Sequence, residues 1–166
     1  MNKALLFCGL LYTDNDFRNR AISELVDMYG EIASYSKTLS FNQFSDYYNA
    51  EFGEGISREW ILFAEEIGLE HLYEKKLNTC SIENKFKNEQ KRMVNIDPGI
   101  ITLNNLQLLT TKNFAHRIYL GEGIYCELTM LFSKSGVRYL EWTYPDYKTK
   151  EAEEFFIESR KKLKKQ

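Results

Sequence analysis

The chain has 166 residues, of which 43% are hydrophobic and 28% charged, and a formal net charge of −2. This length suits one domain that buries roughly two-thirds of the surface of its unfolded chain, so we expect a single domain over residues 1–166. The slightly acidic balance argues against broad nucleic-acid binding, which needs a basic surface to displace counterions. Aromatic residues make up 14% of the chain and favour a strand-rich fold.

The cysteines and the apolar runs indicate the compartment. Cys8, Cys80 and Cys126 lie far apart and show neither a CxxC nor a Cys/His spacing typical of zinc, so we expect buried free thiols in a reducing compartment. The apolar run near the N-terminus is too short for a signal peptide, and no run approaches the ~20 residues of a membrane helix. The sequence therefore predicts a cytoplasmic protein without membrane contact.

The first third of the chain alternates strands and a helix. Residues 4–12, ALLFCGLLY, form a continuous apolar run that predicts a central strand buried on both faces. Apolar positions at helical spacing predict a helix over 17–29 that follows capping residues and ends at Gly30. Residues 32–41 alternate loosely like a half-buried strand, and residues 58–67 predict another strand.

The middle of the chain adds a loop and a second helix. Residues 42–55 are dense in aromatics and acids, which either pack the loop onto the body or line a ligand pocket. Residues 69–90 predict a helix whose lysines and glutamates form a solvated face. Residues 92–96 predict a strand that Pro98 and Gly99 break. This order of elements is the ferredoxin-like β-α-β-β-α-β order.

The last third is predicted to be mostly strands. Residues 100–103 and 106–112 indicate strand segments around a turn at 104–105, and two hairpins follow. Thr149 caps an amphipathic helix over residues 150–165. The sequence therefore predicts an α+β domain with a mixed or antiparallel sheet, in which a ferredoxin-like start precedes C-terminal β-hairpins and a terminal helix.

The hairpin over residues 116–132 has the best-determined register. With Gly121-Glu122-Gly123 as a three-residue turn, side-chain parity gives one apolar and one polar face. The expected cross-strand pairs are Leu120 with Ile124, Tyr119 with Tyr125, Ile118 with Cys126, and Arg117 with Glu127. His116 falls on the apolar face.

Two interpretations of the hairpin's polar face remain open. It can be a solvent-facing ion pair beside packed tyrosines, worth about 0.2–1 kcal/mol per pair. It can also be a cavity floor, in which Arg117, held by Glu127, meets an anionic ligand while tyrosines stack on a ring. His116 is either a core histidine satisfied by a backbone group or a catalytic base.

The segment Asn95-Ile96-Asp97-Pro98-Gly99 is a second constellation. Asn95 and Asp97 project from the same face of a strand, and Pro98 keeps Asp97 extended. Gly99 permits a turn or a close backbone approach. An Asx-Pro-Gly turn explains these residues structurally, whereas the functional interpretation makes Asp97 a metal ligand or general base. The chain contains no P-loop, GxGxxG, HExxH, GxSxG or EF-hand motif, which argues against a P-loop NTPase.

Five segments, in this order along the chain, resemble those of a known family: LLFCGLLYTD, FSDYYNAEFG, KRMVNIDPGIITL, TTKNFAHRIYLGEGIYCELTMLF and WTYPDY. Through them the chain resembles the prokaryotic domain-of-unknown-function family 4416. The resemblance implies a small, single-domain cytoplasmic protein without an established activity. Some members are labelled GTP-binding, a label that no motif in this chain supports. Ile100 and Cys126 replace a usual Tyr and Ala, and neither change removes a polar candidate.

Taken together, the motifs suggest a site for a phosphorylated or otherwise anionic ligand that bears a ring, such as a nucleotide. The catalytic candidates are Asp97, Glu127 and His116. The candidates for ligand binding are Lys91, Arg92, Asn95, Lys112, Arg117, Tyr119, Tyr125, Asp46, Tyr47 and Tyr48. The alternatives are a non-enzymatic module that binds protein or RNA, and a structural factor whose motifs only maintain the fold. The sequence assigns no residues to a metal site, leaves open whether a divalent metal is used, and names no reaction, cofactor or oligomeric state.

Overall fold

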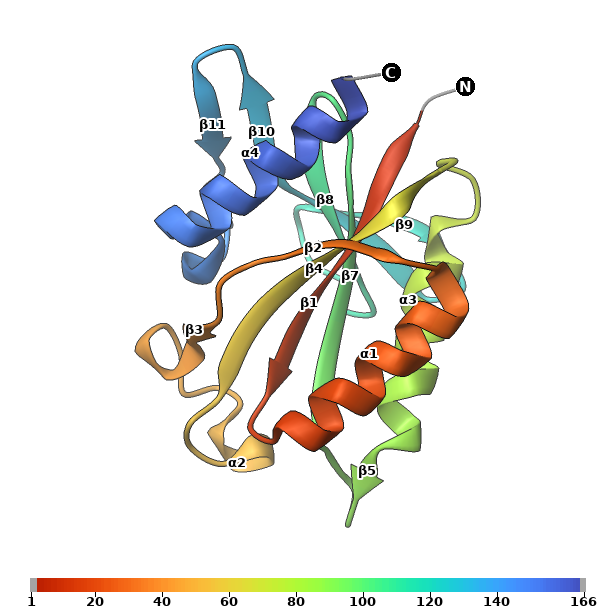
Figure 1. Cartoon of the computed structure of the whole chain (residues 1–166), viewed down its shortest axis with the longest axis vertical. Coiled ribbons are helices and arrows are strands. Elements are labelled where there is room, and N and C mark those ends of the chain that lie inside the picture. The colour runs from red at the N-terminus through yellow and green to blue at the C-terminus, as the bar shows by residue number, and fades with distance from the viewer. Residues whose placement is uncertain (1–2, 165–166) are drawn as a thin grey trace.

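An antiparallel sheet organises the computed structural model, which describes residues 3–164 (Figure 1). Its main path has the strand order β11-β10-β8-β7-β1-β4-β2, while β3 pairs with β4 and β9 pairs with β10. Within the described residues, this sheet has nine strands, and a separate two-stranded hairpin holds β5 and β6. The nine strands are β1 (Ala4–Tyr12), β2 (Ile32–Tyr35), β3 (Leu39–Ser40), β4 (Ser57–Ile67), β7 (Val94–Ile101), β8 (Asn105–Thr110), β9 (Arg117–Gly121), β10 (Ile124–Ser133) and β11 (Gly136–Tyr139).

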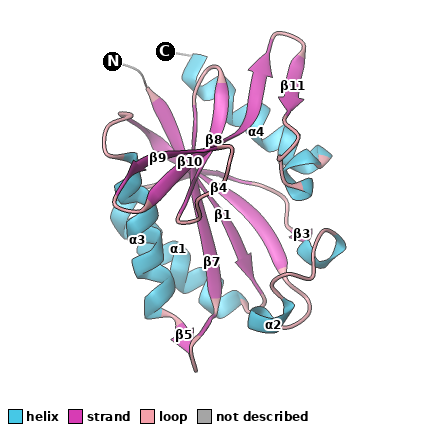
Figure 2. Cartoon of the chain, turned by 180° about the vertical axis from the view of Figure 1, so that it is seen from behind, coloured by secondary structure: helices cyan, strands magenta, loops and turns pink. Residues whose placement is uncertain are grey.

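Helices cover both faces of the sheet. In Figure 1, α1 and α3 lie on one side of the sheet and α4 lies on the other. In Figure 2, α4 and β11 are at one end of the molecule, while α2 and the small hairpin that contains β5 are at the other. The remaining elements are α1 (Asn15–Tyr29), η1 (Phe41–Gln43), α2 (Asn49–Phe52), α3 (Leu72–Lys85), β5 (Lys87–Asn88), β6 (Lys91–Arg92), η2 (Pro145–Lys148) and α4 (Lys150–Lys164).

Strand β1 is buried along its whole length, as the sequence predicts. Phe7 on one face packs edge-on against Phe156 of α4, with 5.1 Å between ring centroids. Leu6 and Leu10 on the other face join a cluster with Leu25 of α1. Each fully buried Leu or Phe contributes about 1.5–3 kcal/mol to folding, so a two-sided central strand is the natural anchor of both layers.

The predicted helix caps are confirmed. Asp14 Oδ1 accepts a hydrogen bond from Asp16 N at 2.7 Å, and Gly30 ends α1 with φ of 84°. Thr149 Oγ1 accepts from Ala152 N at 3.2 Å at the start of α4. The predicted extension of this last helix to Lys165 lies outside the described residues.

Two predicted elements have the wrong bounds. The helix predicted over residues 69–90 is α3, which ends at Lys85, because the chain then turns back in the β5–β6 hairpin. The strand predicted over residues 32–41 is divided into β2 and β3. The ferredoxin-like start stays a prediction, since short elements interrupt the chain between β2 and β4. The single α+β domain with an antiparallel sheet and a terminal helix is as expected.

The predicted register of the β9–β10 hairpin is confirmed for three of its pairs, including the charged pair. Tyr119 pairs with Tyr125, Ile118 with Cys126, and Arg117 with Glu127. The expected pairing of Leu120 with Ile124 is wrong, because a bulge sets Ile124 against Gly121. The apolar face of the hairpin is only partly buried. Ile124 on β10 is 1% exposed, whereas Ile118 on β9, at the free edge, is 72% exposed.

The cysteines are free, as expected, but only Cys8 is fully buried, while Cys80 and Cys126 are half-buried. Burial raises the pKa of the Cys126 thiol to about 11. Over residues 3–164, no helix combines the length and the apolar character that crossing a membrane would require.

Candidate functional site

Strands β7 and β8 separate part-way along their length. They pair from Gly99 with Leu108 to Ile101 with Leu106, and β8 then continues along β10 without β7. A cavity of about 460 Å³ is lined by residues of both strands near this divergence. Its volume lies within the range of small-molecule pockets.

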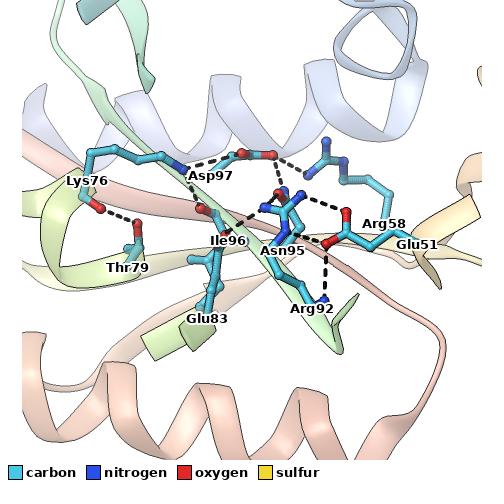
Figure 3. A network of polar contacts seen from close by, with 9 residues as sticks. All are labelled: Glu51, Arg58, Lys76, Thr79, Glu83, Arg92, Asn95, Ile96 and Asp97. Carbon is cyan, nitrogen blue, oxygen red and sulfur yellow. Dashed lines mark hydrogen bonds and ion pairs between the residues drawn. The ribbon is translucent and has the colours of Figure 1, made fainter. Parts of the chain in front are cut away.

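The NIDPG segment forms the edge of β7 beside this gap. Ile96 N donates to Glu83 Oε1 at 2.6 Å, and Ile96 O accepts from Lys76 Nζ at 3.0 Å (Figure 3). Amides two residues apart on a strand face the same edge, so the nitrogen of Pro98 faces this edge too. β8 does not pair with β7 at Pro98, so no hydrogen bond from this position to β8 is required. The missing N–H of proline therefore does not interrupt the strand. The predicted turn at Asp97-Pro98-Gly99 is therefore wrong.

Gly99 lies where β7 and β8 come together. A Cβ atom on Gly99 would lie 2.4 Å from Phe7 Cζ and 2.5 Å from the backbone oxygen of Gln107. Of the two roles expected for Gly99, a turn or a close backbone approach, the structure shows the close approach. Gly99 and Pro98 thus mark the two sides of the point at which the sheet opens.

Four side chains form the cavity floor, a name used below for Arg58, Lys76, Asn95 and Asp97. Asn95 and Asp97 share a face of β7, as predicted, and Asn95 Nδ2 donates to Asp97 Oδ2 at 2.8 Å. The same Asp97 oxygen lies 3.4 Å from Arg58 Nη1, and its partner oxygen lies 3.8 Å from Lys76 Nζ (Figure 3). Asp97 therefore holds two cations that come from β4 and α3.

Arg58 is only 5% exposed. Its Nε donates to Asp146 Oδ2 at 2.8 Å and its Nη1 contacts Asp97. Burial opposes the charge of Arg58, but Asp146, Tyr147 and Asp97 outweigh it and raise the pKa of Arg58 above its ordinary value. Its Nη2 has no partner in the described part of the chain, so Arg58 keeps N–H donors for a molecule in the cavity.

Arg92 anchors the floor at one side. Its Nε and Nη2 donate to both carboxylate oxygens of Glu51 at 2.7 and 3.0 Å, and its Nη1 donates to Asn95 Oδ1 at 2.7 Å and to Glu83 at 3.2 Å (Figure 3). The hydrogen bonds from Arg92 lower the pKa of Glu51, whereas burial raises the pKa of Glu83. This fork fixes the amide of Asn95, and Asn95 in turn orients Asp97.

The hairpin brings a second cationic group to the cavity. Arg117 Nε donates to Glu127 Oε2 at 2.8 Å, its Nη1 to Lys112 O at 2.9 Å, and its Nη2 to the Tyr144 hydroxyl at 3.0 Å. The side chains of Arg117 and Glu127 are 10% and 2% exposed. The pair is therefore buried rather than solvent-facing, and burial together with Glu127 raises the pKa of Tyr144.

His116 lies elsewhere than the alternation predicts. Its Nε2 is 2.9 Å from Glu127 Oε2, and its ring stacks on Trp142 with 4.6 Å between centroids. The prediction that His116 lies on the apolar face is wrong, because His116 precedes the first residue of β9 and escapes the alternation of the strand.

Two residues form the cavity rim, a name used below for Tyr47 and Lys112. Lys112 Nζ lies 3.4 Å from the Tyr47 hydroxyl and 5.2 Å from the centre of its ring. Tyr48 packs against Phe41 with 5.9 Å between centroids, and burial raises the pKa of Tyr48. The aromatic loop thus both packs onto the body and lines the cavity.

The structure brings most of the sequence-predicted site residues together. Those that line the cavity are Arg92, Asn95, Asp97, Lys112, Arg117, Glu127, Tyr47 and Tyr48. Those that do not are Lys91, Tyr119, Tyr125, Asp46 and His116. Lys91 is exposed on β6, and Asp46 accepts from Asn49 on the surface. Tyr119 and Tyr125 lie outside the lining and contact each other, with 5.3 Å between their ring centroids. His116 bonds to the lining residue Glu127.

The charged lining residues that sequence reasoning missed are Arg58, Lys76 and Asp146, and it also missed Tyr144, which bonds to Arg117. Tyr144 and Asp146 belong to the WTYPDY segment, so that segment carried a signal for them. Lys76 and Glu83 were expected on a solvated helix face, but both are buried against β7. Helical periodicity alone cannot show that a strand edge beside the helix lacks a partner.

Among residues 3–164, no group of three or more His, Cys, Asp or Glu side chains is arranged to hold a metal ion. Asp97 is instead engaged by Arg58, Lys76 and Asn95.

These observations define an α+β protein with a cation-lined cavity between two diverging strands. The chain belongs to the family described as domain of unknown function (DUF4416), whose model matches residues 2–163. Comparison with curated proteins and with solved structures gave no match.

Proposed function

We propose that the cavity binds a small ligand that carries an anionic group. The observation that carries this proposal is the charge of the lining. Five cationic side chains and three carboxylates line the cavity. Arg92 is set aside because Glu51 and Glu83 neutralise it, and the other four cations face three carboxylates, an excess of one positive charge. The cations are Arg58, Lys76, Arg92, Lys112 and Arg117, and the carboxylates are Asp97, Glu127 and Asp146.

The cations differ in how much donor capacity remains for a ligand. Arg92 uses four of its five N–H donors on Glu51, Glu83 and Asn95, so it serves the site mainly by holding the floor. Arg58 retains Nη2, and Lys112 Nζ contacts only the Tyr47 ring and hydroxyl within the described residues. Arg58 Nη2 and Lys112 Nζ are therefore the donors that we assign to the anion, since charge-assisted hydrogen bonds are the stronger ones.

The aromatic lining supports a ligand with a ring. Phe41, Phe44, Tyr48, Tyr144 and Tyr147 all line the cavity. Aromatic side chains prefer offset or edge-to-face contacts with another ring, each worth about 0.5–1.5 kcal/mol beyond its buried area. A phosphorylated or nucleotide-like molecule meets both requirements, and we propose this class first.

The test is a binding screen by thermal shift and isothermal titration calorimetry. The probes are inorganic phosphate, phenyl phosphate, benzoate and nucleoside monophosphates. A probe present at 100 times its dissociation constant should add about 2.7 kcal/mol to the free energy of unfolding. If no probe changes the melting temperature or releases heat, the proposal is wrong.

A matched pair of variants locates the binding. We expect Lys112→Ala to weaken a phosphate probe about fivefold, because an exposed charge pair contributes up to about 1 kcal/mol. Lys134→Ala also removes an exposed lysine, from the turn between β10 and β11 outside the cavity, and should leave binding unchanged. Equal effects of the two variants would show that the probe binds elsewhere.

A second candidate function is RNA binding beside β9. Phe114, Tyr119 and Trp142 are 65%, 60% and 36% exposed there, and exposed aromatics suit base stacking. Fluorescence anisotropy with a labelled single-stranded RNA tests this candidate. Binding that Tyr119→Ala weakens would support it, and no binding would remove it.

A further inference from the structure

Glu127 carries an acceptor that the protein itself does not use. Its side chain is 2% exposed, and its Oε2 receives both His116 Nε2 and Arg117 Nε at 2.9 and 2.8 Å. Its other oxygen, Oε1, is buried and has no hydrogen-bond partner within residues 3–164. A buried acceptor without a partner costs about 1–3 kcal/mol, so this oxygen needs a donor from outside the protein.

The surrounding contacts fix the orientation of this carboxylate. Glu127 lies on β10 between Leu108 of β8 and Arg117 of β9. Arg117 is itself held by Lys112 O and the Tyr144 hydroxyl. Rotating the carboxylate would break both bonds to Oε2. Glu127 lines the cavity and its Oε2 is occupied, so Oε1 is the acceptor that remains on this side chain.

We infer that the ligand of this cavity carries, besides its anionic group, an N–H or O–H donor that bonds to Glu127 Oε1. The inference rests on the proposed function and narrows it from any anion to one with an amino, amide or hydroxyl group. A buried site that hydrogen-bonds a donor discriminates strongly against analogues without it, because the acceptor is then left unpaired. Glu127 also disfavours an anionic group at its own end, and so orients the ligand.

Glu127→Gln reverses the chemistry of this position at nearly constant volume. Arg117 and His116 still need an acceptor where Oε2 lies, so the amide oxygen takes that place and the amide nitrogen replaces Oε1. The variant therefore presents a donor to the cavity where the unaltered chain presents an acceptor. Glu122→Gln, in the exposed turn of the same hairpin, is the matched control.

The experiment compares phenyl phosphate with the ortho, meta and para isomers of aminophenyl phosphate by isothermal titration calorimetry. The three isomers place one N–H donor at different distances from the phosphate. For the unaltered chain and for Glu122→Gln, we expect one isomer to bind about tenfold tighter than phenyl phosphate. In Glu127→Gln that advantage should disappear, while inorganic phosphate should bind at least as tightly as to the unaltered chain, because the substitution removes a negative charge from the lining.

The outcomes separate this inference from the proposed function. If phosphate and phenyl phosphate bind but no isomer gains affinity, Oε1 is served by water alone and the inference is wrong, while the anion site stands. A gain that survives in Glu127→Gln also overturns the inference. If no probe binds, both proposals fail. If Glu127→Gln does not fold by circular dichroism, the comparison of isomers on the unaltered chain decides by itself.

Discussion

The cavity floor and the cavity rim differ in how deeply their side chains are buried and in how many partners each side chain has. On the floor, Arg58 is 5% exposed and bound to two carboxylates, and Asp97 contacts three side chains. On the rim, Tyr47 is 70% exposed, and Lys112 touches it through a 3.4 Å contact. The floor is therefore part of the fold's stability, whereas the rim can exchange its partners for a ligand at little cost.

The largest expected effect comes from Arg58→Ala. The substitution leaves Asp146 buried without its cation and removes one partner of Asp97. Breaking a buried pair in this way costs about 3–5 kcal/mol. Urea unfolding should show this loss, whereas Arg138→Ala, on the exposed side of β11, should change stability by less than about 0.5 kcal/mol. Equal stabilities would contradict the structural role of the floor.

Gly9→Ala should act on the floor indirectly. Gly9 pairs with Asp97, and a Cβ atom there would lie 2.8 Å from Arg58 Nη1 and 3.2 Å from the Trp60 ring. We expect a loss of about 1–3 kcal/mol in urea unfolding, because overpacking moves side chains out of their minima.

A double variant checks this explanation of Gly9. Lysine has no Nη1, so Gly9→Ala combined with Arg58→Lys should lose less stability than the sum of the two single changes. Additive losses would mean that the glycine matters for another reason.

Glu51→Gln should have a smaller effect that depends on pH. The pKa of Glu51 is lowered from 4.5 by Arg92, so its ionised form contributes stability that is present above 4.5 and is lost as pH falls through the lowered pKa. We expect the unaltered chain to be about 0.5–1 kcal/mol more stable than the variant at neutral pH. The difference should vanish in acid, and urea unfolding at both pH values measures it. A difference that grows on acidification would contradict this assignment.

The smallest effect on stability is expected on the rim. Tyr47→Ala removes a side chain that is 70% exposed and contacts Lys112 and Tyr48. The free energy of unfolding, measured by urea unfolding, should change by no more than about 0.5 kcal/mol, as for most surface substitutions. A loss as large as that of Arg58→Ala would abolish the distinction between rim and floor.

Much of the fold follows from local patterns in the sequence. The nine apolar residues of β1 predict a strand buried on both faces, and Asp14, Gly30 and Thr149 mark helix ends by capping. The parity of the β9–β10 hairpin places Arg117 opposite Glu127. These features depend on neighbours close in sequence, so periodicity and turn chemistry suffice to find them.

Two of three errors share a physical cause. Pro98, Lys76 and His116 were each assigned from local rules: proline breaks strands, helical lysines face water, and strand residues alternate. The assignment of His116 fails because β9 begins only at Arg117, so His116 lies outside the alternation of the strand and bonds to Glu127. The other two fail because of distant elements: β8 separates from β7 beside Pro98, and α3 covers the open edge with Lys76. Such contacts leave no mark in the spacing of nearby residues.

The sequence by itself determined the two segments on which the site depends, NIDPG and the β9–β10 hairpin, together with most of their polar residues. Only the tertiary structure decided that the two segments share one cavity, and that Arg58, Lys76 and Asp146 complete it. The reason is that β7 and β8 pair over three residues and then separate, so that buried charge replaces backbone pairing. That exchange depends on where strands diverge in space, which side-chain alternation along a single strand does not encode.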